Sequence, residues 1–331
     1  MTNRVRGESQ RGARVPRRRS GFTLPELLIT ITLLGIIGTL LSTILMRQQR
    51  FHRAVASVAD SRARMRDVAT ILPTDLRSIS TAGRDILTMD VNSMQFRAFV
   101  GAAVLCKYGA VNIIEVPPRV LASRNVLTAW IAPPAPGDIA YLYNDSTTAG
   151  NADDSWTAFS ITDTTSAVNP AWCPPTNVPP FTTLADAGAR RYRLTLNANP
   201  NQAQIHIGAP IRFAREVRYS IYQAADNQYY VGYEKCVPNA NPTLPGACSN
   251  REVLAGPVLP ATTDTLTSGL FFVYYDKDGN RITDPLQAGS IARISVGIRT
   301  TSESLRQATA SNTRFAGGDS LRFVVGIRNR I

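Results

Sequence analysis

The longest apolar run of the chain lies near its N-terminus. From Leu27 to Met46 no residue is charged, and these twenty positions cover about 30 Å of helix, the thickness of the hydrocarbon core of a bilayer. A secretory signal peptide has a shorter apolar region, of about 7 to 15 residues, followed by a cleavage site with small side chains. Here the run ends in "MRQQRFHR", without such a site. The pattern predicts a membrane-spanning helix.

A helical pattern continues beyond this run. Apolar residues with a spacing of four and three, interrupted by Arg62, form one stripe that consists of Phe51, Val55, Val58, Met65, Ala69, Leu72 and Leu76. Such a stripe favours a helix with one face packed on a domain and its arginines in water. A free coiled coil is the alternative, but three imperfect heptads are short for one. We expect a second helical half over residues 47–78, which Pro73 kinks or ends.

From about Asp90 the period of the pattern changes to two. Seven short alternating segments rich in β-branched and aromatic residues predict strands: "SMQFRAFV", "YRLTLN", "EVRYSIYQ", "QYYVGYEK", "GLFFVYYD", "IARISVGI" and "LRFVVGI". The segments 224–227 and 276–280 are typical of hairpin turns. Residues 133–185 are rich in Pro, Gly and Asp, which predicts a loop-rich insertion. The expected fold class is α+β, a long N-terminal helical spine packed on an antiparallel β-sheet head over residues 79–331.

The positive charge is concentrated at the N-terminus. Of the net charge of +12, the first 21 residues supply 7 − 1 = +6, from Glu8 and the arginines Arg4, Arg6, Arg11, Arg14, Arg17, Arg18 and Arg19. By the positive-inside rule this leader keeps the N-terminus cytoplasmic and sends the rest of the chain outward. The remainder carries only 12 − 6 = +6, so contact of the later arginines with nucleic acid or lipid headgroups stays an alternative to a solvated face.

The start of the apolar run carries a specific motif. "SGFTLPELLITITLLGIIG" resembles the N-terminus of a type IV prepilin, which has a basic leader ending in Gly, then Phe, and a Glu at the fifth position of an apolar helix. The resemblance implies that a prepilin peptidase cleaves between Gly21 and Phe22 and methylates the new amino group of Phe22. It divides the N-terminal region into a cleaved leader, 1–21, and a transmembrane helical half, 22–46.

Glu26 is the single acidic residue beside the apolar run. An ionised carboxylate inside a bilayer costs a few kcal/mol, so an accidental Glu in a plain signal anchor is the less favoured reading. Cleavage would expose a cationic amine at the positive end of the helix dipole, and a nearby carboxylate neutralises both. The resemblance assigns Glu26 to docking of the subunit into a filament. Pro25 is compatible with this position, because the first four amides of a helix have no helical partner.

Small side chains recur along one face of the predicted membrane helix. Thr32, Gly35, Thr39 and Ser42 follow each other at three- and four-residue spacing, and such stripes allow membrane helices to approach closely. We expect a helix packing surface here; a helix that merely tolerates small residues is the alternative.

The chain has four cysteines. In an exported domain an even number suggests two disulfides. Of the three connectivities we favour Cys236–Cys248, which closes a short loop, and Cys106–Cys173, which pins the loop-rich region. Zinc is the alternative, but there is no CxxC motif and no cluster of histidines to support it. No metal or other cofactor is expected.

The sequence offers little for catalysis. Its only histidines are His52 and His206, and we interpret the second as a structural residue of a strand. "DKDGN" at 276–280 has its glycine at the fourth position instead of the sixth, which is wrong for an EF-hand, so a turn is favoured over a calcium site. A membrane-anchored periplasmic enzyme remains a minor alternative without a convergent polar site to support it. We expect no enzymatic activity.

A second, weaker resemblance covers residues 209–331. In order and content, "REVRYSIYQAADNQYYVGYEK", "LFFVYYDKDGNRI" and "RFVVGIRNR" are similar to PilW-like minor pilins and to J-type minor pseudopilins of type II secretion. The 310 residues after Gly21 fit the pilus group better than the compact secretion group. The resemblance implies an inner-membrane subunit with a periplasmic head that later joins a surface pilus and helps to initiate its assembly at the tip.

The same resemblance implies the partners of such a subunit. They are prepilin peptidase, other minor and major pilins, the inner-membrane assembly platform, and membrane lipid before assembly. A role as a minor pseudopilin, or as a tip module for adhesion or DNA uptake, is the alternative.

Overall fold

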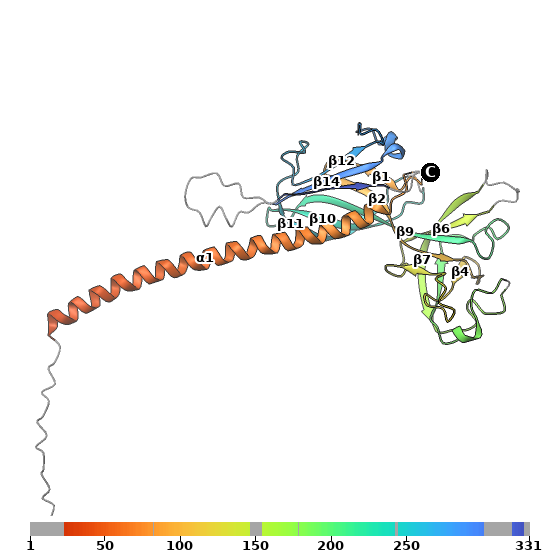
Figure 1. Cartoon of the computed structure of the whole chain (residues 1–331), viewed down its shortest axis with the longest axis horizontal. Helices are drawn as coiled ribbons and strands as arrows, with labels where there is room; N and C mark the ends of the chain where they lie inside the picture. The colour runs from red at the N-terminus through yellow and green to blue at the C-terminus, as the bar shows by residue number, and fades with distance from the viewer. Residues whose placement is uncertain are drawn as a thin grey trace, which may run out of the picture. The chain divides into compact units, whose positions relative to one another are not determined.

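The computed structural model describes residues 23–81, 83–145, 154–177, 179–241, 244–300 and 320–327, apart from the side chains of four helical residues, Ala54, Ser57, Val58 and Ser61. The chain divides into two compact units at Ala54. Gly21 and Phe22, the expected cleavage junction, lie outside the described residues. Helix α1 and many of the strands of the head are labelled in Figure 1. An apolar N-terminal helix followed by a mostly antiparallel β-domain confirms the expected α+β fold.

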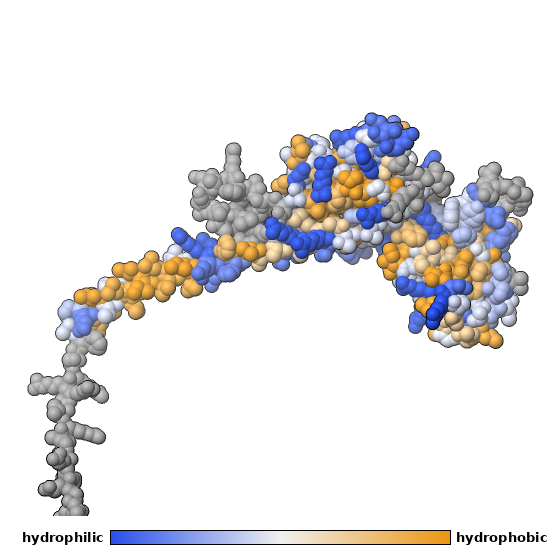
Figure 2. All heavy atoms as spheres, in the orientation of Figure 1, coloured by the Kyte–Doolittle hydropathy of each residue, from blue (hydrophilic) through white to orange (hydrophobic). Residues whose placement is uncertain are grey.

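Helix α1 runs from Leu24 to Arg77. Its first part, Leu24–Arg53, contains an 18-residue stretch with a mean hydropathy of 2.3 and is long and apolar enough to cross a membrane. None of this part is buried within the chain, and Figure 2 shows apolar residues over much of its surface, which gives way to hydrophilic residues farther along the helix. This part of α1 is called the membrane part below.

The C-terminal part of α1 belongs to the second unit and contributes to the core of the head. Met65, Val68, Leu72 and Leu76 are buried, at spacings of three and four. The predicted stripe is only partly right: Phe51 and Val55 are exposed, and Val68 takes the place that the stripe gives to Ala69, which is half-buried. At 3.6 residues per turn, Val68 and Ala69 lie about 60° and 40° to opposite sides of the line that joins Met65, Leu72 and Leu76. The helical period alone therefore does not favour Val68, which is fully buried by its contacts in the core of the head.

Pro73 does not end α1, which continues for four residues to Arg77. The following residue, Ser78, ties the helix end to the sheet: its hydroxyl accepts a hydrogen bond from the amide of Phe99 at 2.9 Å. The helical half predicted over 47–78 therefore extends through its proline almost to its expected end.

The head contains two antiparallel sheets. The larger has eleven strands, which are β1 Ile86–Met89, β2 Ser93–Val104, β3 Lys107–Tyr108, β4 Ile113–Val116, β5 Ala129–Trp130, β6 Ile139–Asn144, β7 Ser155–Ala167, β8 Arg191–Leu196, β9 Pro210–Gln223, β10 Tyr229–Val237 and β11 Ala247–Val258. The smaller has the order β13-β12-β14-β15, with β12 Leu270–Tyr275, β13 Arg281–Ile282, β14 Arg293–Arg299 and β15 Ser320–Gly326. In the connections that the structure describes lie the 3₁₀ helices η1 Leu184–Asp186 and η2 Pro285–Ser290.

Two large hydrophobic cores stabilise the described part of the head, beside a small cluster of Ile139, Tyr141 and Ala214. The first joins α1 to both sheets and includes Leu72, Phe96, Tyr219, Phe272 and Val296. The second lies within the larger sheet and includes Leu105, Ile114, Trp130, Leu142, Leu194 and Phe213. The paired strands β2 and β9 supply residues to both cores. We call the part of the head around the second core the second lobe.

The prediction of a loop-rich insertion at 133–185 is largely wrong for the first half of this range. This range contains β6 and β7, and β6 lies between β9 and β7 inside the larger sheet. The segment folds as a sheet hairpin because alternate residues of β6 and β7, such as Leu142, Phe159 and Ile161, enter the second core. After Ala167 the described backbone of this range is irregular up to η1, as the prediction had it.

The seven predicted strands correspond to parts of β2, β8, β9, β10, β12, β14 and β15, and both predicted hairpin turns are turns. Residues 224–227 join β9 to β10, with Asn227 at a φ of 61°. Residues 276–280 join β12 to β13, where the Asp276 carboxylate accepts hydrogen bonds from the amides of Asp278 and Asn280.

Candidate functional site

The N-terminal end of α1 accommodates a proline in its first turn. Among the described residues, the amide of Leu27 donates to the carbonyl of Thr23 at 3.2 Å. Pro25 is the second residue of α1 and so one of the first four positions, whose amides have no partner within a helix. The structure accounts for a proline here without any break in the helix.

Glu26 lies in the first turn of α1 and is exposed. A carboxylate in a first turn interacts favourably with the positive end of the helix dipole. After Glu26 the next acidic residue in the sequence is Asp60. Within the chain, Glu26 therefore stands at the start of a long apolar surface that carries no other negative charge.

The small-residue stripe, Thr32, Gly35, Thr39 and Ser42, lies on the membrane part of α1 within about 80° of arc. The hydroxyls of Thr32 and Thr39 donate to carbonyls of their own helix, those of Ile29 and Ile36, at 2.9 and 2.8 Å. These bonds satisfy polar groups that would otherwise be exposed to hydrocarbon. A Cβ added to Gly35 would meet nothing within 4 Å, so the described residues leave the stripe uncovered at this position.

Comparison with known protein families gives one match at this end of the chain. The model described as the prokaryotic N-terminal methylation motif matches residues 16–42. The N-terminal segment is a prepilin-like methylation motif. It supports a type IV pilin-like or pseudopilin-like precursor, a membrane-anchored structural protein that prepilin peptidase processes and that associates with other pilins. No curated protein and no solved structure matches the chain.

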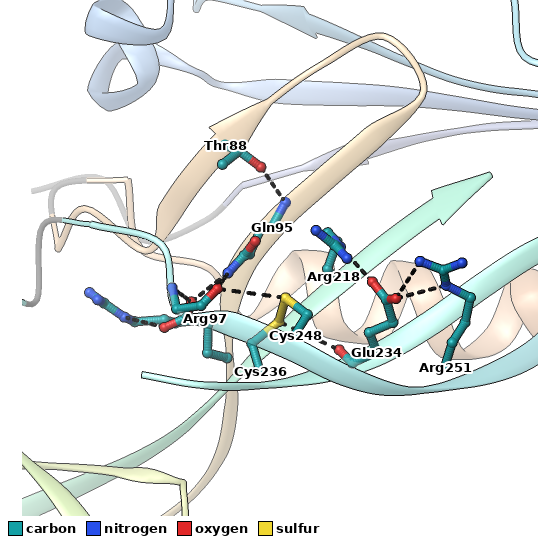
Figure 3. The surroundings of a disulfide bond; sticks show 10 residues. Thr88, Gln95, Arg97, Arg218, Glu234, Cys236, Cys248 and Arg251 are labelled. Atoms are coloured by element: carbon teal, nitrogen blue, oxygen red, sulfur yellow. Dashed lines mark hydrogen bonds and ion pairs between the residues drawn. A yellow bond between two sulfur atoms is a disulfide. The ribbon is translucent and has the colours of Figure 1, made fainter. Parts of the chain in front are cut away.

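The four cysteines form two disulfides, Cys106–Cys173 and Cys236–Cys248. These are the connectivities favoured from the sequence. Cys236 and Cys248 are directly opposite each other on β10 and β11, with Cα atoms 3.9 Å apart. This disulfide links the two strands of the β10–β11 hairpin, and Figure 3 shows the residues around it.

The second disulfide anchors the irregular segment after β7. Its partner Cys106 follows β2, and the amide of Cys173 donates to the buried carboxylate of Glu115 at 2.7 Å. Arg193 donates to the same carboxylate at 2.7 Å and stacks over Trp172, 4.4 Å from the ring centroid. The disulfide and this charge pair hold the segment on the second lobe through independent contacts.

Strands β9, β10 and β11 carry a cluster of charged side chains around a buried carboxylate, which the sequence pattern did not reveal. Glu234 on β10 lies between Arg218 and Arg251, which donate to its two oxygens at 2.5 and 2.7 Å (Figure 3). Burial opposes ionisation of Glu234, but the hydrogen bonds from the two arginines outweigh it and hold its pKa below the ordinary value. The cluster is charge-paired, which fits a structural role.

Beneath the β10–β11 connection lies a second carboxylate, Glu216, with no exposed surface. It accepts hydrogen bonds from the amide of Gly246 and the side chain of Gln95, each at 2.6 Å, and pairs with Arg97 at 4.0 Å. A side chain at 246 would lie 1.9 Å from the carbonyl oxygen of Val237. Glycine is therefore required for the connection to approach Glu216 this closely.

A second polar contact, which is partly buried, joins the end of α1 to the sheet. The hydroxyl of Tyr219 donates to Asp75 at 2.6 Å. Burial raises the pKa of the Asp75 carboxyl, against the lowering effect of this hydrogen bond and of the Arg215 charge. Burial also raises the pKa of Tyr219, so the hydroxyl remains a donor throughout the physiological range.

The residues considered for chemistry do not converge. His206 is in an exposed turn before β9 and not in a strand, since its segment contains Gly208 at a φ of 96°. In the described part of the chain no group of three or more His, Cys, Asp or Glu side chains is placed to hold a metal ion. Asp154 accepts a hydrogen bond from the Tyr143 hydroxyl at 2.6 Å, while Asp153 lies outside the described residues.

Proposed function

We propose that the chain is the precursor of a minor type IV pilin that helps to initiate pilus assembly at the filament tip. One observation carries the proposal: the methylation motif at 16–42 coincides with the start of a helix whose first part is long and apolar enough to cross a membrane. The β-rich head that follows, with its two disulfides, suits an oxidising compartment outside the cytoplasm.

In this proposal the leader 1–21 is removed between Gly21 and Phe22, and Phe22 is N-methylated. Glu26 then provides the negative charge that meets the new amine of a neighbouring subunit. The small-residue stripe forms part of the helix contact in the filament. The periplasmic helical half, 47–78, joins this transmembrane half to the head, 79–331.

The cellular course of the subunit follows from the leader. Its arginines keep the N-terminus cytoplasmic, so the chain resides in the inner membrane with a periplasmic head until the assembly platform and other pilins take it into a filament. The role is structural, without cofactor or enzymatic activity. The second lobe makes the head larger than the part that surrounds the first core, which favours a minor subunit over the repeating subunit of the filament. The competing assignments are a minor pseudopilin of type II secretion and a tip module for adhesion or DNA uptake.

Mass spectrometry of the N-terminus tests the processing step. We expect a mature chain that begins with N-methylated Phe22 in cells with an active prepilin peptidase, and the full-length precursor in cells without it. A chain that retains Met1 in the presence of the active peptidase would contradict the assignment.

The role of Glu26 is tested by separating cleavage from assembly. We expect Glu26→Ala to be cleaved and inserted normally but to be depleted from the sheared filament fraction, because its membrane helix no longer carries the counter-charge. Glu26→Asp is the matched control, since it keeps the charge and should retain much of the incorporation. Normal incorporation of the Ala variant would contradict the docking role, and loss of secretion in place of loss of filaments would favour the pseudopilin assignment.

A further inference from the structure

Three arginines stand where the apolar surface of α1 ends. Arg47, Arg50 and Arg53 are helical and exposed, and they are the first charged residues after Glu26. Successive residues of an α-helix are rotated by about 100°, so the three side chains lie within about 120° of arc on one side of the helix. We call them the exit arginines.

The exit arginines have no acidic residue of the same helix within reach. Asp60, the next acid in the sequence, is seven residues beyond Arg53, or about 10 Å along the helix axis. The arginines farther along α1 differ, because Arg62, Arg64 and Arg66 stand between Asp60 and Asp67. The exit turn therefore presents three positive charges that its own part of the helix leaves unneutralised.

Their depth places them among lipid headgroups when α1 crosses a membrane. The twenty uncharged residues Leu27–Met46 cover about 30 Å of hydrocarbon, and a headgroup layer adds about 5 to 8 Å on each side. The exit arginines span about 9 Å of rise directly beyond that run. Helical side chains tilt toward the N-terminus of their helix, so these long side chains lean back toward the membrane.

We propose that the exit arginines form an anchoring site for the phosphate groups of anionic lipids in the periplasmic leaflet. The inference rests on the membrane residence that the proposed function gives to α1. It explains an otherwise unfavourable choice of residues, because arginines close to the translocated end of a span work against the orientation that the leader sets. Guanidinium groups bind phosphate through paired hydrogen bonds, which makes Arg suited to this task.

Lipid selectivity of the full-length chain tests the site. The chain is reconstituted into phosphatidylcholine bilayers that contain a trace of spin-labelled phosphatidylglycerol or spin-labelled phosphatidylcholine, and the motionally restricted fraction gives the ratio of the two association constants. Neutralising all three positions, Arg47→Gln, Arg50→Gln and Arg53→Gln, should lower that ratio at least about fivefold, the effect of one arginine at an anionic surface. High salt should lower the wild-type ratio in the same direction.

The control changes the same amount of charge elsewhere. Arg119→Gln, Arg124→Gln and Arg281→Gln alter three exposed arginines of the head and should leave the lipid ratio unchanged. An equal fall with the control would show an effect of net charge alone and would overturn the proposal, as would an unchanged ratio with the exit variant.

A neighbouring subunit is the competing occupant, because the arc partly shares the side of α1 that carries the small-residue stripe. An exit variant that keeps its lipid ratio but enters filaments poorly would assign the arginines to that partner and overturn the lipid site. The lipid measurement requires neither cleavage nor assembly. A failure of the pilin assignment would appear only in the N-terminal mass spectrum.

Discussion

The buried face of α1 makes the helix a part of the core of the head, and Leu72→Ala measures that contribution. The Leu72 side chain has no exposed surface and lies in the core formed with both sheets. Truncation to Ala removes three carbon groups, each worth about 0.8 kcal/mol of transfer free energy, or roughly 2.4 kcal/mol in all. The cavity left behind adds to this, so we expect a total loss of about 3 to 4 kcal/mol in the free energy of unfolding.

The adjacent residue provides the control. Ile71 is 42% exposed on the same turn of α1, and Ala is the better helix former, so Ile71→Ala should lose less than about 1 kcal/mol. Both variants are compared with the wild type by urea unfolding of the full-length chain in detergent micelles, followed by tryptophan fluorescence and far-ultraviolet circular dichroism. If Leu72→Ala lost no more stability than Ile71→Ala, the helix would not be part of the core.

Three further perturbations probe the head by the same unfolding measurement. Burial raises the pKa of Asp75 in the folded protein above its unfolded value of 3.8. The protonated carboxyl therefore contributes its full stability below pH 3.8, and this contribution is lost as the pH rises through the folded pKa. Because Asn does not titrate, Asp75→Asn should become more stable relative to the wild type as the pH rises, and a difference that stays constant with pH would refute this. Ala at both cysteines of the β10–β11 disulfide should cost about 3 kcal/mol by loop entropy, given the sequence separation of 12; an unchanged midpoint would count against it. A methyl group at Gly297 would lie 2.1 Å from the Phe271 ring, so Gly297→Ala should lower the free energy of unfolding by about 1 to 3 kcal/mol. Gly326→Ala on the neighbouring strand is the control and should lower it far less, because a methyl group there would meet nothing within 4 Å. Equal losses in the two variants would contradict the prediction.

The sequence pattern predicts the parts of the fold that are strongly apolar or rich in strand-forming residues. The membrane part of α1 follows from the uncharged run alone, and the seven predicted strands follow from their β-branched and aromatic residues, many of which enter a core. The pattern does not find β11, since "ACSNREVLAGPV" includes Asn, Gly and Pro, and most of its first seven residues are exposed. An edge strand held by one neighbour needs no apolar face, so it leaves no alternating signal.

Tertiary contacts determine what the pattern misses. β6 and β7 are flanked by turn-forming residues, and only their position between β9 and β8 shows that their apolar side chains fill a core. Glu216 and Glu234 occupy polar positions of alternating strands, where the expected environment is water. They are buried because the β10–β11 hairpin supplies Gly246 and Arg251 as partners, and the sequence places neither next to them.

At the N-terminal site, the motif residues can be predicted from the sequence because they follow each other at short, fixed spacing within residues 16–42. The two disulfides could be favoured from loop reasoning, but the contacts around them could not. Glu115, for example, accepts from Cys173 across 58 positions, a separation that no local pattern encodes. The resulting limit is physical: local periodicity reports which face is buried and not what buries it.

The strands β2 and β9 link the two cores. Met94, Phe96 and Ala98 of β2 belong to the first core, and Val100 and Ala103 farther along the same strand belong to the second. The second lobe is therefore not an independent domain joined to the head by linkers, and cleavage in a loop would not separate it from the head as an intact unit. In a head without the second lobe, β2 and β9 would end where the first core ends, so adding the lobe amounts to lengthening these two strands. Transferring the lobe to another head would therefore require transferring both strands with it.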